Sequence, residues 1–148
     1  MYNRYFMDLA IKQAEEGIEY GDGGPFGCVI VKDGKYIAGA HNMVLATNDC
    51  TAHGEIEAIR AACDKLNSHK LDGCELYTTA GPCPMCLGAI QWSGIRKVYY
   101  GCNVSDTEKI GFKDKEFYDK DMIDLECQDR DRCLELFKSY EESDAERY

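Results

Sequence analysis

Strand-like and helix-like segments alternate along the first two-thirds of the chain, and this order constrains the fold more than any other feature. Apolar spacing and turn residues predict helices at 2–19, 52–66 and 84–93, and strands at 26–31, 36–44, 74–78 and 97–100. The strands at 26–31 and 36–44 flank a Lys-Asp-Gly-Lys turn and form a hairpin. Strands that alternate with helices predict an α/β fold in which a sheet is covered on both faces.

The chain fits one domain, 1–148, whose last third differs in charge from the rest. The net charge is −10, and residues 105–148 hold 15 acidic against 8 basic side chains. We expect a compact body followed by a more solvated acidic segment, in which 130–142 forms a helix with Cys133, Leu134 and Phe137 turned inward. The acidic charge disfavours nucleic acid as a partner, because binding to phosphates usually needs a basic surface.

Nine cysteines are the unusual part of the composition. An odd number excludes a complete set of intrachain disulfides. Residues 1–17 carry five charged side chains and lack the apolar core of a signal peptide, and no apolar run approaches the ~20 residues of a membrane span. We therefore expect a cytoplasmic protein, not bound to membranes, in which the cysteines are reduced.

Two of these cysteines, Cys83 and Cys86, stand three positions apart at the predicted start of the helix at 84–93. Thiols at this spacing lie on the same side of the first helical turn and can reach one metal ion. The amides at a helix N-terminus also favour thiolates. Taken alone, the pair is ambiguous between a redox site, half of a structural zinc site and a chance spacing.

A second candidate group, His53 with Glu55, stands at the start of the helix predicted at 52–66. His53 can supply a nitrogen ligand, whereas Glu55 is two residues further on and points elsewhere on the helix. One histidine and two cysteines give three protein ligands and leave a fourth position open, which is the pattern of catalytic rather than structural zinc. The sequence thus favours a catalytic zinc site.

The His-Gly-Glu segment at 53–55 and the Pro-Cys-Pro-Met-Cys segment at 82–86 together resemble the signature of zinc-dependent nucleobase and nucleoside deaminases. The resemblance covers residues 1–118. It implies the cytidine deaminase-like fold, a three-layer α/β/α sandwich around a five-stranded mixed sheet. It also implies one zinc ion per subunit on His53, Cys83 and Cys86, with Glu55 as the catalytic acid and base of a hydrolytic deamination.

Further residues resemble the guanine branch of this family. The Gly-Phe-Lys-Asp segment at 111–114 is similar to the Gly-Phe-Asp-Asp of bacterial guanine and plant guanosine deaminases, with Lys113 in place of an aspartate. The resemblance implies that Asp114 accepts hydrogen bonds from the N–H groups of guanine. It assigns substrate contacts to five more residues: Phe26, Asn42, Gly54, Trp92 and Tyr148.

The expected reaction is therefore deamination of guanine to xanthine and ammonia, in a homodimer whose C-terminal segments, 105–148, are exchanged between subunits. Three alternatives stay open. Segments 41–43, 53–56 and 76–79 also resemble fungal cytosine deaminase, which keeps cytosine or another small base or nucleoside as a substrate. The family includes tRNA adenosine deaminases. A zinc-binding module without activity would need a fourth ligand, for which Cys50 and Cys102 are the nearest candidates.

Overall fold

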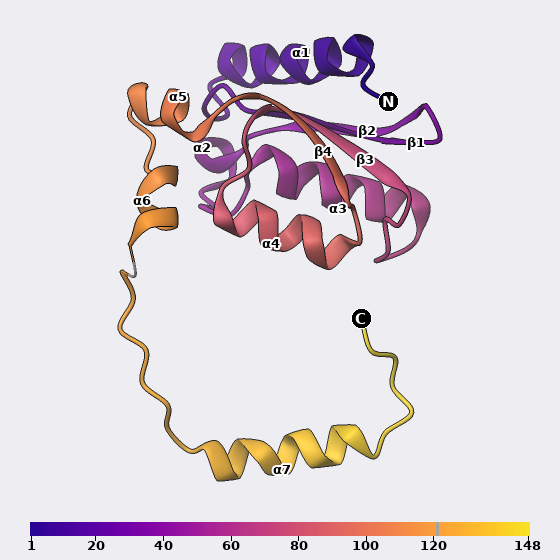
Figure 1. Cartoon of the computed structure of the whole chain (residues 1–148), viewed down its shortest axis with the longest axis vertical. Helices are drawn as coiled ribbons and strands as arrows, with labels where there is room; N and C mark the ends of the chain where they lie inside the picture. Colours follow the sequence, from indigo (N-terminus) through magenta and orange to yellow (C-terminus); the bar gives the residue numbers. More distant parts are fainter. Residues whose placement is uncertain (121) are drawn as a thin grey trace.

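A mixed sheet of four strands forms the centre of the molecule (Figure 1). The computed structural model describes residues 1–120 and 122–148. The strands lie in the order β2-β1-β3-β4, with the following bounds: β1 Gly27–Lys32, β2 Lys35–His41, β3 Cys74–Ala80 and β4 Lys97–Cys102. Strand β1 pairs antiparallel with β2 and β3, whereas β3 and β4 are parallel.

Helices cover both faces of this sheet, which confirms the predicted three-layer α/β/α arrangement. Helix α1 (Arg4–Tyr20) lies on one face, and α3 (Gly54–Leu66) and α4 (Pro84–Ser93) lie on the other (Figure 1). Strand β1 supplies both cores, since Val29 and Val31 face α1 while Cys28 and Ile30 face α3 and α4. Successive side chains point to opposite faces of a strand, so a continuous apolar run suits this central position.

Local signals explain where the helices begin and end. The Asn3 side chain accepts a hydrogen bond from the Tyr5 amide and caps α1, which ends at Gly21 in the left-handed conformation. Helix α4 begins directly after Cys83, with Pro84 in the first turn, where a missing N–H costs nothing. Among residues 1–120 and 122–148, no helix is long and apolar enough to cross a membrane.

The sheet has four strands in the described residues, not the predicted five. The segment that follows β4 forms two short helices, α5 (Val104–Lys109) and α6 (Asp114–Asp119). Reciprocal hydrogen bonds between Asn103 and Asp106 form a capping box that starts α5 and so ends the extended chain. The strand predicted at 36–44 is also shorter, because the chain turns after His41 into the short helix α2 (Val44–Thr47).

Helix α7 (Arg130–Glu141) forms an arm that lies apart from the rest of the chain, across an opening (Figure 1). The prediction of a helix here is confirmed, but the predicted inward packing is wrong within one chain. Cys133 is exposed, Leu134 is only partly buried and Phe137 is 68% exposed, because the helix lies apart from the body formed by the described residues up to 120 (Figure 1). The tail returns to the body through Glu146, whose carboxylate lies 3.4 Å from His69 and 3.5 Å from Lys70.

Candidate metal centre and active site

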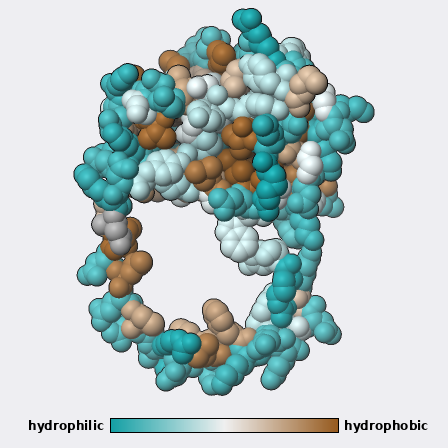
Figure 2. All heavy atoms as spheres, viewed as in Figure 1, coloured by the Kyte–Doolittle hydropathy of each residue, from teal (hydrophilic) through white to brown (hydrophobic). Residues whose placement is uncertain are grey.

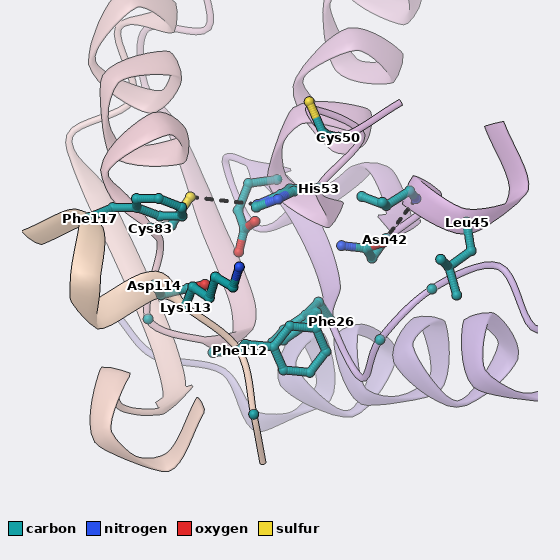
Figure 3. Close-up of a pocket in the computed structure, with 17 residues that line it drawn as sticks. Phe26, Asn42, Leu45, Cys50, His53, Cys83, Phe112, Lys113, Asp114 and Phe117 are labelled. Carbon is teal, nitrogen blue, oxygen red and sulfur yellow. Dashed lines mark hydrogen bonds between the residues drawn. The ribbon is translucent and has the colours of Figure 1, made fainter. Parts of the chain in front are cut away.

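Three side chains that can bind a metal meet where α3 and α4 begin. His53 directly precedes α3, Cys83 directly precedes α4, and Cys86 lies in the first turn of α4. Nδ1 of His53 is 3.5 Å from Sγ of Cys83 and 3.6 Å from Sγ of Cys86. All three ligand atoms lie within 4.8 Å of one another, so one ion can contact them together. Figure 3 shows His53 and Cys83 facing each other across this point.

The chemistry of these three donors fits zinc. Two sulfurs and an imidazole nitrogen are ligands that zinc prefers, and three protein ligands leave one position for water or substrate. A hydrogen bond from the Cys86 thiol lowers the pKa of Cys83 to about 4, whereas the same contact and burial raise the pKa of Cys86. A bound cation would favour the thiolate form of both sulfurs.

Glu55 lies in the first turn of α3, beside the metal ligands, and is only 6% exposed. The hydroxyl of Thr78, on β3, donates a hydrogen bond of 2.6 Å to Oε1 of Glu55. Burial raises the pKa of Glu55, and the bond from Thr78 opposes that rise. The hydrogen bond therefore holds the carboxylate in one orientation, and the pKa of Glu55 lies above that of an exposed glutamate.

A pocket of about 590 Å³ opens in front of His53 and Glu55 (Figure 3). Its walls come from the loop before β1, from the end of β2 and from the segment between α5 and α6. Phe26 and Phe112 meet edge to face in this wall, with ring centroids 4.9 Å apart. A pocket of this size, with aromatic walls and a few polar groups, suits a small planar ligand.

Three of the residues predicted to contact substrate line this pocket: Phe26, Asn42 and Asp114. Asn42 is 6% exposed, and its Oδ1 accepts a hydrogen bond of 3.0 Å from the Val44 amide, so its NH₂ group is left for the pocket. Asp114 is the first residue of α6, and burial raises the pKa of its carboxyl group. The hydroxyl of Tyr118, one turn further on, donates to the carbonyl of Pro82 and holds α6 against the metal loop.

Gly54, predicted to contact substrate, is not in the pocket wall. It lies buried at the start of α3, where an added Cβ would stand 3.1 Å from the carbonyl oxygen of Phe26. A residue without a side chain lets α3 approach the start of β1 closely. Gly54 therefore serves the packing that brings His53 and Glu55 to the pocket.

Trp92 and Tyr148 also lie outside the pocket of their own chain. Trp92 is 73% exposed near the end of α4, about 9 Å along the helix axis from Cys86. Tyr148 is 83% exposed and lies against Trp92, with ring centroids 6.2 Å apart. The Glu146 contacts with His69 and Lys70 bring the tail to this side of the body, which explains why it does not reach the pocket.

Sequence reasoning assigned no role to Thr78 or Lys113, which the structure places at the site. Thr78 is 1% exposed and contacts Glu55, and a signal was available, since a threonine pair interrupts the apolar pattern just before the cysteine motif. Lys113 directs its side chain into the pocket (Figure 3). The sequence identifies Lys113 only as a departure from the aspartate of related sequences.

Comparisons with known proteins agree with this geometry. Residues 1–102 match the family described as the cytidine and deoxycytidylate deaminase zinc-binding region. A guanine deaminase of Bacillus subtilis is 46% identical over 130 residues, which cover 88% of this chain and 82% of that protein. A tRNA-specific adenosine deaminase of Aquifex aeolicus is 45% identical over 100 residues, which cover 68% of this chain and 66% of that protein.

Solved structures resemble the whole chain or its body. The X-ray structure of guanine deaminase from Bacillus subtilis matches with a TM-score of 0.93 at 40% identity, covering 100% of this chain and 99% of that one. A guanine deaminase structure from Nitrosomonas europaea matches with a TM-score of 0.68 at 35% identity, covering 74% of this chain and 63% of that one.

We expect the purified protein to hold one zinc ion per chain and Cys86→Ala to lose it, because two remaining ligands bind zinc weakly. Metal content measured by elemental analysis checks this. Cys133→Ala, which removes an exposed thiol of α7, should keep the full amount. Equal zinc in both variants would contradict the proposed ligand set.

Proposed function

Because the chain belongs to the cytidine and deoxycytidylate deaminase family, we propose that it is a zinc-dependent aminohydrolase that converts guanine to xanthine and ammonia. The observation that carries this proposal is the buried carboxylate of Glu55 beside a three-ligand metal group, at the base of a pocket with an acidic wall residue, Asp114. The 46% identity to a guanine deaminase over most of the chain supports the choice of base.

Hydrogen-bonding groups in the pocket suit guanine. The carboxylate of Asp114 accepts hydrogen bonds only, and the free edge of Asn42 donates them. Guanine offers N–H donors and ring or carbonyl acceptors on neighbouring edges, so it can satisfy both side chains. The face of Phe26 supplies a surface on which the base stacks.

The chemistry follows from the roles proposed for the residues around the base. When bound to His53, Cys83 and Cys86, zinc supplies a water molecule of lowered pKa. Glu55 would take one proton from the attacking water and deliver it to a ring nitrogen. It would then take the second proton from the added hydroxyl and pass it to the amine, which leaves as ammonia while the carbonyl forms. Burial raises the pKa of Glu55, which helps this carboxyl group both to take up and to release a proton. Thr78 keeps Oε1 of Glu55 oriented throughout.

Deamination of adenosine in tRNA is the second candidate. The similarity to a tRNA-specific adenosine deaminase, 45% over 100 residues, favours it. A net charge of −10 disfavours it, since a polyanion is repelled by an acidic surface. A tRNA-specific adenosine deaminase of Buchnera aphidicola covers 92% of the chain, but at 33% identity, against 46% identity over 88% of the chain for the guanine deaminase.

We further propose that 1–148 is one deaminase domain and works as a homodimer. Of the segment 105–148 expected to be exchanged between subunits, α5 and α6 stay on their own body, because Asp114 lines its pocket and Tyr118 contacts Pro82, and the exchanged part is the arm that carries α7. Hydrophobic side chains of α7 support this proposal, because Leu136, Phe137 and Tyr140 are exposed on an arm that is separated from its own body (Figure 2). A second copy of the body would cover them.

Nine free cysteines support a cytoplasmic location for the protein. Four of them are exposed, and thiols on a surface persist where the surroundings are reducing. Two others, Cys83 and Cys86, must stay reduced to bind zinc.

Glu55→Gln should lower kcat by a factor of about 100 to 10,000 while zinc is retained, because the amide cannot accept the proton. Ammonia release from guanine, guanosine, cytosine, cytidine and adenine measures both the activity and the choice of substrate. Glu57→Gln, in the same helical turn, is the matched control and should remain active. Turnover of cytosine but not of guanine would overturn the proposed substrate. A fully active Glu55→Gln variant would overturn the role of Glu55.

Asp114→Asn should reduce kcat/KM for guanine by roughly 10- to 100-fold, since one hydrogen bond to a charged acceptor is lost and a donor is placed opposite the N–H groups of the base. Steady-state kinetics measures the loss. Asp119→Asn, at the exposed end of α6, should change little. If both variants are equally active, Asp114 does not contact the base.

Sedimentation analysis should give twice the chain mass of 16.7 kDa. Phe137→Glu should shift the protein towards the monomer, because a charge replaces an apolar side chain at the proposed interface. Glu135→Gln, on the same helix, should leave the dimer intact. A monomeric wild-type protein would remove both the dimer and the exchange of segments.

A further inference from the structure

We propose that Asp22 and His41 are positioning residues that hold the amide of Asn42 in its base-binding orientation through a closed ring of hydrogen bonds. The ring passes through the loop before β1, the end of β2 and the start of α2, so it frames one whole wall of the pocket. The inference rests on the proposed function, because it concerns how that pocket holds its base.

The imidazole of His41 forms the first part of the ring. His41 is the last residue of β2 and directly precedes Asn42. Its Nε2 lies 2.8 Å from Oδ2 of Asp22, and its Nδ1 lies 3.1 Å from Oε1 of Gln13 on α1. The side chains of His41 and Asp22 are only 15% and 20% exposed. A hydrogen bond to a carboxylate in such a shielded position is stronger than one on the open surface.

The backbone of Asp22 forms the second part. Its carbonyl oxygen accepts hydrogen bonds from the amides of Leu45, at 3.0 Å, and Ala46, at 3.1 Å, both in α2. The amide of Val44, at the start of the same helix, donates to Oδ1 of Asn42. Asn42 is therefore linked to α2, α2 to Asp22, Asp22 to His41, and His41 through the chain back to Asn42.

This ring determines which end of the Asn42 amide faces the base. Rotation of the amide by half a turn would place its NH₂ group against the Val44 amide, so that two donors would face each other. Oδ1 therefore stays on α2, and the NH₂ group points into the pocket (Figure 3). The pocket presents a donor at this position, which selects a base with an acceptor there.

The loop before β1 packs directly against the side-chain amide of Asn42. A Cβ added to Gly23 would lie 2.2 Å from Oδ1 of Asn42, and one added to Gly17 would lie 2.8 Å from Cδ2 of His41. The loop and the end of α1 thus lie directly on Asn42 and His41. Loss of the Asp22 contact would let the loop and the amide move together.

The ring should affect the binding of the substrate more than the catalytic steps. Glu55 and the metal ligands lie in α3 and α4 or directly before them, in segments that the ring does not include. Weakening the ring should therefore raise KM and leave kcat nearly unchanged. A general loss of folded protein would instead lower the apparent kcat at constant KM.

Asp22→Ala tests the proposal while it leaves Asn42, Glu55 and the metal ligands in place. We expect KM for guanine to rise roughly tenfold, with kcat within about twofold and zinc content unchanged. Asp22→Asn keeps an acceptor for the imidazole N–H and should restore most of the lost affinity. Glu19→Gln removes an exposed acid at the end of α1 and is the matched control, with KM and kcat unchanged.

A double-mutant cycle separates positioning from general damage. If Asp22 acts through Asn42, then adding Asp22→Ala to Asn42→Ala should raise KM no further than Asn42→Ala alone. Additive increases would overturn the proposal. An unchanged KM in Asp22→Ala, or a fall in kcat alone, would also overturn it.

A measurement without substrate keeps this proposal distinct from the proposed function. The side-chain amide protons of Asn42, assigned by NMR through their absence in Asn42→Ala, should exchange with solvent faster in Asp22→Ala than in Glu19→Gln. If exchange is faster in Asp22→Ala but the wild-type protein does not deaminate guanine, the proposal about the ring holds and the proposed function is wrong. If exchange is unchanged and the wild-type protein does deaminate guanine, the proposal about the ring is wrong and the proposed function holds.

Discussion

The meeting of two helix N-termini is the constraint on which the rest of the site depends. His53, Cys83 and Cys86 come from segments 30 residues apart in the chain, yet their ligand atoms lie within 4.8 Å. This requires α3 to approach the start of β1 closely, which Gly54 permits. It also requires α4 to begin at Cys83, which Pro84 favours. The aromatic and polar pocket wall is then assembled around these two fixed points.

The central layers could be predicted because local patterns and tertiary structure agree there. The apolar run of β1 has to be buried on both faces, and the predicted helix at 84–93 coincides with α4 because a proline and the metal cysteines define its start. The metal group could be predicted for a related reason. Ligand chemistry restricts the residue types, and strand-helix connections bring helix starts to one edge of the sheet.

The remaining features depend on contacts that local patterns do not encode. Nothing in the spacing of residues around Trp92 indicates that its ring lies on the solvent side of α4, away from the pocket. The residue spacing correctly predicted a helix at α7, but it does not indicate which surface, if any, covers the apolar side chains of that helix. Thr78 shows the same limit, because a polar residue in a buried strand has a partner that only the fold reveals.

The hydrogen-bonded ring around Asn42 has a consequence for redesign of the pocket. Asn42 cannot be treated as a single position that sets base preference, since Val44, Asp22 and His41 determine which face of its amide is available. A substitution that removes the donor, such as Asn42→Asp, would keep an acceptor for the Val44 amide and turn a second carboxylate oxygen, in place of the NH₂ group, towards the pocket. Directed evolution towards another base should therefore recover coupled changes along the loop, β2 and α2, with few gains from position 42 alone.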